Sequence, residues 1–276
     1  LITGVDSVIL VTKLKAHLKN LPYDYGFEPL FNGKDLTGWK GLVGNPVYRS
    51  KQTPAALNDL QAKADAKIIN DWVVKDGMLV FTGHGDNLCT EKKYGDFEMY
   101  VDWKITEKGD AGIYLRGSPQ VQIWDTSRRE VGAQVGSGGL YNNQKNVSKP
   151  LVVADHKIGE WNTFHIIMKA DKVTVYLNGI LVTDNIGLEN YWDRKIPIFL
   201  KDAIELQAHG NHIVYRNIYV KELVPQPSYK PEEVGFEPLF DGSSLFNWTG
   251  NTTDYYPVNG ELIIDPKRGG KGNLYT

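Results

Sequence analysis

The stretch Phe97-Glu-Met-Tyr-Val-Asp-Trp-Lys-Ile105 alternates apolar and polar side chains along its whole length. A period of two residues is typical of a β-strand with one buried face. The same alternation recurs in residues 71–75, 77–82, 111–116, 120–124, 161–169, 172–177, 204–209 and 214–223. Hairpin signals such as Asn178-Gly179 join some of these stretches. We therefore expect an all-β fold of about ten short antiparallel strands, a β-sandwich of the jelly-roll type.

A helical segment interrupts this β pattern. Residues 53–66 open with Thr53-Pro54 and continue with several alanines. Threonine is a favoured helix N-cap, and proline fits the first helical position. We predict a short helical insert that lies over the sheet or beside its mouth. It is either a surface decoration or an element that covers a substrate.

The composition is that of a globular protein with little net charge. The 276 residues include 31 Lys+Arg and 33 Asp+Glu, a formal net charge of −2. This balance argues against a protein that binds nucleic acid or an anionic membrane surface through charge. No segment reaches the roughly 18 apolar residues of a membrane-spanning helix. The single cysteine, Cys89, excludes a disulfide framework and a cysteine-based zinc site.

The chain carries an internal repeat with a long period. Residues 27–39, Phe-Glu-Pro-Leu-Phe-Asn-Gly-Lys-Asp-Leu-Thr-Gly-Trp, recur as 236–248 with eight of 13 positions identical. The offset of 236 − 27 = 209 residues indicates a duplicated domain rather than a solenoid repeat.

We therefore expect four parts along the chain. They are a helical remnant of a preceding domain (1–25), a complete jelly-roll domain (26–223), a proline-rich linker (224–234) and a truncated second copy (235–276).

Several motifs of the first copy, taken together, resemble a known family. They are residues 27–39, Asp110-Ala-Gly-Ile-Tyr-Leu-Arg-Gly117, Gly159-Glu-Trp-Asn-Thr163 and Glu205-Leu-Gln-Ala-His-Gly210. The stretch 26–223 resembles the 3-keto-disaccharide hydrolase family. The resemblance implies a concanavalin-like or glucanase-like jelly roll that binds a carbohydrate on its concave face and cleaves glycosides oxidised at C3. It also implies a bacterial protein exported to the periplasm, and leaves the oligomeric state unknown.

Strand alternation gathers polar and aromatic side chains on one face of three strands. Amides and carboxylates bind sugar hydroxyls, and aromatic rings stack on the C–H faces of sugars. The glycine-rich loop 136–143 is expected to form the rim of this face. We assign substrate-binding roles to Tyr114, Gln120, Gln122, Trp124, Asp125, Gln207, Tyr141 and Asn142.

Three further side chains are candidates for catalysis. A ketone at C3 acidifies the C2 proton, so that a base can remove it, the C1 substituent can depart by β-elimination, and water can add. We expect His209 or Glu205 to act as base or acid, and Arg116 to stabilise the enolate. Each has a structural alternative: an ion pair for Arg116, a satisfied core position for His209 and a surface pair for Glu205. No cofactor is assigned, and a divalent metal held in part by His209 and Glu205 stays open.

Two other functions stay open at this point. The same face would serve a carbohydrate-binding module without turnover. The duplication and the linker would also suit a structural or adhesion module of a multidomain exported protein.

Overall fold

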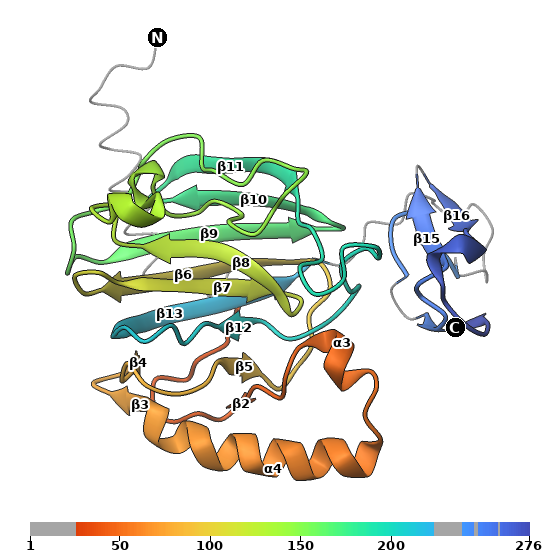
Figure 1. Cartoon of the computed structure of the whole chain (residues 1–276), viewed down its shortest axis with the longest axis horizontal. Coiled ribbons are helices and arrows are strands. Elements are labelled where there is room, and N and C mark those ends of the chain that lie inside the picture. The colour runs from red at the N-terminus through yellow and green to blue at the C-terminus, as the bar shows by residue number, and fades with distance from the viewer. Residues whose placement is uncertain (1–25, 224–238, 246–247, 259) are drawn as a thin grey trace.

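The structure is a computed structural model that describes residues 26–223, 239–245, 248–258 and 260–276. Within these residues, two antiparallel sheets pack face to face around a shared core (Figure 1). The described strands of the large sheet number eight and those of the small sheet five. The predicted all-β jelly-roll sandwich with a short helical insert is confirmed.

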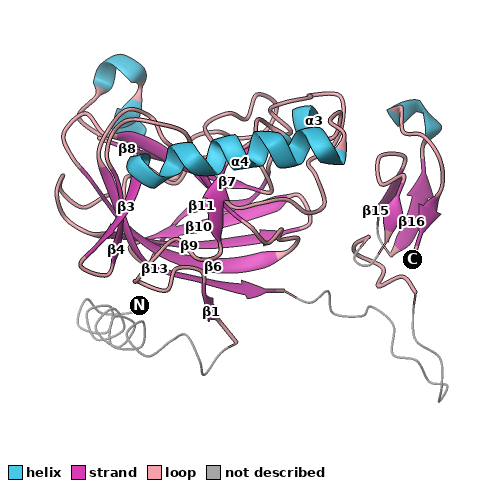
Figure 2. Ribbon diagram, turned by 90° about the horizontal axis from the view of Figure 1, so that it is seen from below, coloured by secondary structure: helices cyan, strands magenta, loops and turns pink. Residues whose placement is uncertain are grey.

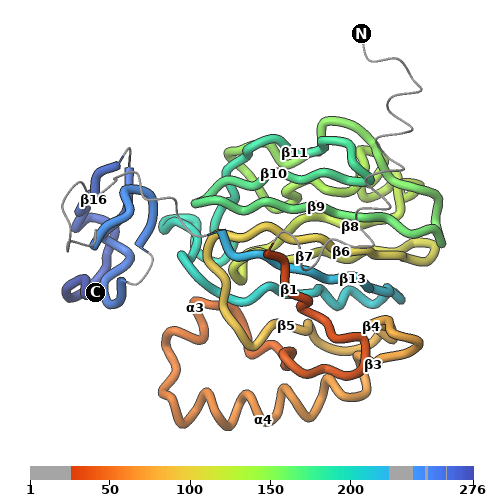
Figure 3. The backbone as a smooth tube through the Cα atoms, turned by 180° about the vertical axis from the view of Figure 1, so that it is seen from behind, coloured from red at the N-terminus to blue at the C-terminus, as the bar shows by residue number. Residues whose placement is uncertain are grey.

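The large sheet has the strand order β11-β10-β9-β6-β13-β4-β3, and β1 pairs with β13 (Figure 3). Its strands are β1 (Glu28–Pro29), β3 (Trp72–Lys75), β4 (Met78–Phe81), β6 (Phe97–Ile105), β9 (Asn162–Lys169), β10 (Lys172–Leu177), β11 (Ile180–Gly187) and β13 (Ile213–Glu222).

The small sheet has the order β2-β5-β12-β7-β8. Its strands are β2 (Trp39–Gly41), β5 (Leu88–Thr90), β7 (Asp110–Leu115), β8 (Ser118–Trp124) and β12 (Glu205–Leu206). Two 3₁₀ helices, η1 (Arg129–Val131) and η2 (Ala133–Val135), follow β8.

The core forms where the alternating apolar positions of the two sheets meet. In β6, every second residue from Phe97 to Ile105 is buried, as its sequence pattern predicts. The Trp103 ring lies 5.3 Å from the ring of Phe164 on β9. Ile113 on β7 and Leu206 on β12 supply the facing side from the small sheet, both fully buried. The opposite face of the small sheet is therefore turned away from the core, and we call it the site face.

The insert forms the helix α4 (Pro54–Asp71), which lies along one side of the sandwich (Figure 2). As predicted, the Thr53 side chain caps it by accepting the N–H of Ala56. The helix packs on the edge strand β2, where the Gln61 side chain donates to the Gly41 carbonyl at 2.8 Å. A Cβ on Gly41 would lie 2.5 Å from the Ala64 carbonyl, so only glycine permits this contact. The helix thereby covers an otherwise open sheet edge.

A shorter helix, α3 (Pro46–Arg49), precedes α4. Its Arg49 guanidinium donates to the carbonyls of Val43 and Gly44, and it pairs with the Asp202 carboxylate at 2.8 Å. Asp202 lies just before β12, so this ion pair fastens the segment 43–50 to the start of that strand.

The C-terminal residues form a small separate set of strands, drawn in blue in Figure 1. They are β14 (Thr249–Gly250), β15 (Tyr255–Val258), β16 (Glu261–Ile264) and β17 (Leu274–Tyr275), with the 3₁₀ helix η3 (Pro266–Arg268). β14 pairs with β17 as β2 pairs with β5, and β15 pairs with β16 as β3 pairs with β4.

One further detail recurs in the two repeats. The Trp39 indole donates to the Leu30 carbonyl at 2.8 Å, and the Trp248 indole donates to the Leu239 carbonyl at 2.8 Å. These correspondences agree with a duplication, which stays a prediction. The expected helical remnant (1–25) and the linker (224–234) lie outside the described residues.

No helix in the described part of the chain is long and apolar enough to cross a membrane.

Candidate active site

Three neighbouring strands, β12, β7 and β8, carry the predicted side chains on the site face. The register sets Glu205 of β12 opposite Tyr114 of β7, and Asp110 of β7 opposite Trp124 of β8. Gln207 lies beside Tyr114, since its side chain donates to the Tyr114 hydroxyl at 3.2 Å. The alternation of each strand therefore brings these groups together as the sequence predicts.

The two glutamines of β8 form a connected network with β7. The Gln120 amide donates to the side-chain oxygen of Gln122. The Gln122 amide donates in turn to the Asp110 carboxylate at 2.8 Å and to the carbonyls of Ala111 and Ile123. Both glutamines are buried, so Gln122 holds the Asp110 carboxylate in place.

Glu205 is the most unusual group on the site face. Only 1% of its surface is exposed, and neither carboxylate oxygen has a partner with good hydrogen-bond geometry among the described residues, although the Asn87 side chain lies close enough to favour the ionised form. Burial raises the pKa of Glu205 to about 8, against the opposing charge of Arg49. The carboxyl group is therefore mostly neutral at pH 7. A neutral carboxylic acid donates a proton or a hydrogen bond.

Tyr114 lies across from Glu205 on the neighbouring strand and is also kept neutral. Burial raises the pKa of Tyr114 to about 12, and the nearby Glu205 adds to the shift. Two neutral O–H donors thus lie side by side on β12 and β7.

His209 occupies the open end of the same face, with 54% of its side chain exposed. Its Nδ1 atom lies 3.8 Å from an oxygen of Asp110. The Arg128 guanidinium also pairs with Asp110, at 3.2 Å. A carboxylate beside an imidazole can orient the ring, and an exposed imidazole can act as a general base.

Arg116 is not brought together with this group, so the structure lends no support to its predicted role in stabilising an enolate. It sits in the turn after β7 with φ +52°, which reverses the alternation of the strand. Its guanidinium is buried, donates to the Gly95 carbonyl at 2.8 Å and pairs with Asp96. The structural alternative, an ion pair, is the observed one.

Asp125 is also not free to bind a substrate. One carboxylate oxygen accepts the Lys108 N–H at 2.8 Å, and the other accepts the Ser127 N–H at 2.9 Å. The residue therefore shapes the turn after β8.

The loop after β8 places one of its two predicted residues at the site. The Tyr141 ring is half exposed and meets the Trp124 ring edge-on at 5.3 Å. Asn142 contributes its carbonyl to Arg194 at 2.7 Å, a contact that supports the loop. A pocket of about 140 Å³ opens beside Trp124 and Tyr141.

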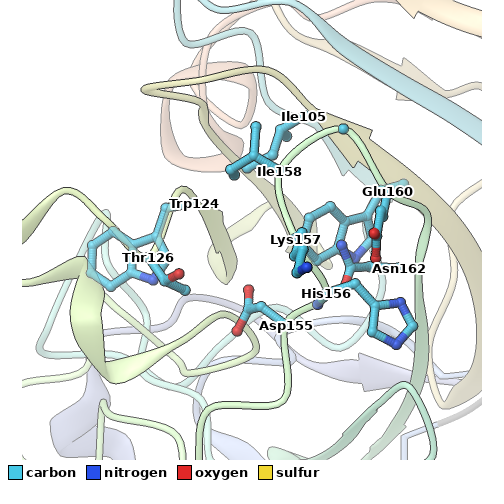
Figure 4. A pocket seen from close by; sticks show the side chains of 11 residues that line it. Ile105, Trp124, Thr126, Asp155, His156, Lys157, Ile158, Glu160 and Asn162 are labelled. Carbon is cyan, nitrogen blue, oxygen red and sulfur yellow. Dashed lines mark hydrogen bonds between the residues drawn. The ribbon is translucent and has the colours of Figure 1, made fainter.

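A second, smaller pocket is also lined by Trp124 and is too small for a sugar. Figure 4 shows Asp155 there, between Trp124 and Lys157. The pocket holds about 10 Å³, which is room for about one water molecule. Burial raises the pKa of Asp155, whose carboxylate accepts the Ser137 N–H at 3.0 Å.

Comparison with known proteins identifies the family. Residues 26–221 match the model of the 3-keto-alpha-glucoside-1,2-lyase-like domain. The chain belongs to this family.

Individual relatives agree with this membership. A 3-keto-disaccharide hydrolase from Bacteroides thetaiotaomicron is 23% identical over 259 residues, which cover 74% of this chain and 81% of that protein. A crystal structure of a candidate glycosyl hydrolase from Parabacteroides distasonis is 27% identical with a TM-score of 0.55, and covers 72% of this chain and 84% of that one. A second from the same organism, 23% identical with a TM-score of 0.53, covers 72% and 95%. The chain is thus a glycoside hydrolase-like enzyme.

Sequence reasoning missed several members of the site in this 3-keto-glucoside lyase-like domain. Asp110 lies two alternation steps before Tyr114 on the same strand, so extending the pattern backwards would have found it. Arg49 belongs to α3, distant from β12 in sequence, and comes near Glu205 only through the fold. Arg128 lies in the turn after β8, and no local sequence pattern there predicts that its side chain reaches the site.

The structure offers little support for the metal option. Among the described residues, no three His, Cys, Asp or Glu side chains gather as a metal-binding group. Glu205 lies on β12, whereas His209 lies three residues beyond the end of that strand.

Proposed function

We propose that this protein cleaves 3-keto-glycosides by removing the C2 proton, eliminating the C1 substituent and adding water. The proposal rests on one observation: the site face carries buried hydrogen-bond donors at one place and an exposed candidate base at another. Two neutral O–H donors, Glu205 and Tyr114, lie at its closed end, and the His209–Asp110 pair lies at its open end. An enolisation needs both kinds of group, a base and a donor that meets the developing oxyanion.

The donor pair fits the C3 oxygen of the substrate. When C2 loses its proton, negative charge develops on this oxygen. A carboxylic acid that its surroundings keep neutral can donate a hydrogen bond to such an oxygen, as can a buried tyrosine. In the proposal, Glu205 and Tyr114 take the place that the sequence assigned to Arg116.

In the proposal, His209 first accepts a proton from the substrate and later returns it. His209 removes the proton from C2, and the electron pair of the broken C–H bond passes to the C3 oxygen. As this pair returns, C1 and C2 form a double bond, the C1–O bond breaks, and the imidazolium of His209 gives its proton to the leaving oxygen. Water then adds at C1 and a proton at C2, so the net change is hydrolysis.

Access to the closed end requires movement near α3. Glu205 is almost fully buried, and Arg49 of α3 is the cation that acts on it. The ion pair between Arg49 and Asp202 helps to hold the segment 43–50 there, together with the buried side chains of Val43 and Pro46. In the proposal, a shift of this segment admits the oxidised ring.

Proton exchange at C2 provides the test. In deuterium oxide, cleavage of a 3-keto-glucoside by this route places one deuteron at C2 of the released sugar per turnover. Direct hydrolysis leaves that position protonated at early times, once exchange of free 3-keto-glucose is subtracted. Product without deuterium at C2 would reject the route, and binding without product would favour the lectin-like alternative.

A pair of histidine variants tests the base. His209→Ala is expected to lower kcat by about 10²–10⁴-fold, the usual contribution of general base catalysis. His212→Ala is the matched control, because His212 is also exposed and lies nearby in the chain. Equal rates for the two variants would remove His209 from the mechanism.

We also propose export to the periplasm, which rests on the family resemblance alone. Fractionation of the source bacterium is expected to recover the protein in the periplasmic fraction. Recovery with the cytoplasmic fraction would contradict this.

A further inference from the structure

Asn87 reaches the closed end of the site face from β5, a strand that the proposed reaction does not use. It directly precedes β5, whose register sets Cys89 opposite Glu205 of β12. Residues two apart in a strand project from the same face, so Asn87 projects from the face that carries Cys89 and Glu205. Since β12 lies between β5 and β7, Asn87 borders the closed end on the side away from the strand of Tyr114.

The orientation of the Asn87 amide follows from one hydrogen bond. Its side-chain oxygen accepts the N–H of Ala208 at 2.9 Å. A backbone N–H can only donate, so the oxygen of the amide, and not the nitrogen, has to face Ala208. The amide nitrogen, which carries two N–H donors and no acceptor, is left for other groups.

Two groups beside this amide can accept from it. The Asn87 side chain lies close enough to Glu205 and to Tyr114 to favour the ionised form of each, which is the effect of a nearby N–H donor. The Tyr114 hydroxyl also accepts from the Gln207 amide at 3.2 Å. One asparagine therefore has an N–H group for each of the two proposed donors.

Donors on the oxygen lone pairs decide where the acid protons point. A hydroxyl or a neutral carboxyl can both donate and accept, so its neighbours set its direction. The Tyr114 oxygen has two lone pairs, and amide N–H groups of Gln207 and Asn87 suffice to occupy both. Because an amide N–H cannot accept, the Tyr114 proton is then left for another acceptor. The same reasoning applies to Glu205, which has one O–H group and one carbonyl oxygen.

We propose that Asn87 is a positioning residue that aims the two donors of the closed end at the substrate. One N–H of its amide serves the Tyr114 oxygen and the other serves the carbonyl oxygen of the Glu205 carboxyl group. Both acid protons then stay available for the C3 oxygen of the oxidised sugar. The inference rests on the proposed function, because it adds a residue to the same site.

Exchange of the amide for a carboxylate tests this role. Asn87→Asp keeps an oxygen for the Ala208 N–H but replaces the N–H groups with an acceptor, which draws the protons of Glu205 and Tyr114 away from the substrate. The kcat for a 3-keto-glucoside is expected to fall about 10²–10³-fold, the cost of losing an oxyanion donor. Asn70→Asp is the matched control, the same exchange at an exposed asparagine of α4, and is expected to leave kcat unchanged.

Truncation of the same side chain separates positioning from a structural role. Asn87→Ala removes the N–H donors without supplying an acceptor, so it is expected to lower kcat only about tenfold, the scale of one neutral hydrogen bond. Asn87→Asp is thus expected to be the less active of the two variants. A purely structural asparagine predicts the opposite order, because only Asn87→Asp keeps the bond to Ala208.

The titration of Glu205 gives a readout that does not depend on activity. The charged and titratable groups that face Glu205 are Arg49, Asp202, Tyr114 and Cys89, and both variants keep them. The carboxyl carbon resonance of Glu205, identified by its loss in Glu205→Gln, reports its pKa, about 8 in the wild type. Asn87→Asp is expected to raise this pKa, because a donor to the ionised form is lost and a second carboxylate is added.

The two readouts keep this inference distinct from the proposed function. If no 3-keto-glucoside is cleaved but the pKa of Glu205 rises in Asn87→Asp and not in Asn70→Asp, the contact stands and the proposed reaction fails. If Asn87→Asp is more active than Asn87→Ala, or leaves the pKa of Glu205 unchanged, the positioning role is overturned.

Discussion

At Glu205, a buried carboxyl without a hydrogen-bond partner in the described residues works against the stability of the fold. Its pKa is raised to about 8 by burial, whereas an unfolded chain ionises it near its ordinary value. Below that ordinary value the carboxyl is neutral in both states, so its ionisation makes no contribution to the free energy of unfolding. As the pH rises towards 8, the unfolded state gains by ionising and the folded state does not, so stability falls.

Glu205→Gln is therefore expected to stabilise the protein at pH 8 relative to wild type, on the order of a few kcal/mol. The amide has nearly the same shape and cannot ionise. Thermal unfolding at pH 4.5 and at pH 8 measures the effect, with the gain in Tm larger at pH 8. An equal change in Tm at both pH values would show that Glu205 does not titrate between them.

At Arg116, substitution is expected to reduce stability and leave the chemistry intact. Arg116→Met leaves the Asp96 carboxylate partly buried and unpaired, at a cost of about 3–5 kcal/mol. The control is Lys92→Met, which breaks the exposed pair with Glu222 at a cost below about 1 kcal/mol. Urea unfolding and the kcat of the folded fraction measure the two effects. A stable Arg116→Met protein with a large loss of kcat would restore Arg116 to the site.

These residues also show what strand alternation can and cannot predict. A period of two places Tyr114, Gln122 and Gln207 correctly, because a strand forces alternate side chains onto one face. It fails at Arg116, where a positive φ begins the two-residue turn to β8, a turn that the following Gly117 signals in the sequence. It also cannot show that Glu205 is covered, since burial depends on segments distant in sequence.

Among the elements, the α3 segment supplies the positive charge that opposes the effect of burial on Glu205. The Arg49 guanidinium favours the ionised carboxylate, so Arg49→Met is expected to raise the pKa of Glu205 further. In the wild type, activity is expected to fall above pH 8 as Glu205 ionises. In Arg49→Met this alkaline limb moves to higher pH, by up to about one unit.

The same variant loosens the segment 43–50, because it removes the ion pair with Asp202. Hydrogen exchange is expected to rise in these residues. Lys67→Met is the control within the insert, where the pair with Asp86 is exposed. If activity falls at the same alkaline pH in Arg49→Met as in the wild type, a group other than Glu205 causes the fall.

The sequence predicts that the insert is a helix, but it does not predict where this helix packs on the sheet. The N-cap at Thr53 and the proline after it mark where α4 begins, because both act locally. Its packing on β2 depends on the absence of a side chain at Gly41. That is a long-range contact which no local pattern encodes.

For the whole molecule, the pairing of the C-terminal strands agrees with the predicted duplication. In β14 and β17, Gly250 faces Leu274 as Gly41 faces Leu88 in β2 and β5. A chance similarity of sequence would not be expected to repeat the strand register as well. The duplication therefore predicts two units that unfold independently.

Matched tryptophan variants test this independence. Trp39→Phe and Trp248→Phe each remove an indole that donates to a carbonyl nine residues earlier. Trp39→Phe is expected to raise hydrogen exchange within residues 26–223 alone, and Trp248→Phe within residues 239–276 alone. Exchange that rises in both units for either variant would mean a single cooperative unit.

The central claim for the molecule is that neutral donors at the closed end of the site face stabilise an enolate. The pH dependence of kcat/KM for a 3-keto-glucoside, measured for wild type, Glu205→Gln and Glu205→Ala, tests it most directly. Glu205→Gln keeps a neutral donor, so it is expected to stay within about tenfold of wild type at pH 7 and to lose the alkaline limb near pH 8. Glu205→Ala is expected to lose about 10²–10³-fold, the cost of removing one oxyanion donor. If Glu205→Gln is as inactive as Glu205→Ala, Glu205 acts as a proton-transfer group or a ligand, and the account is wrong.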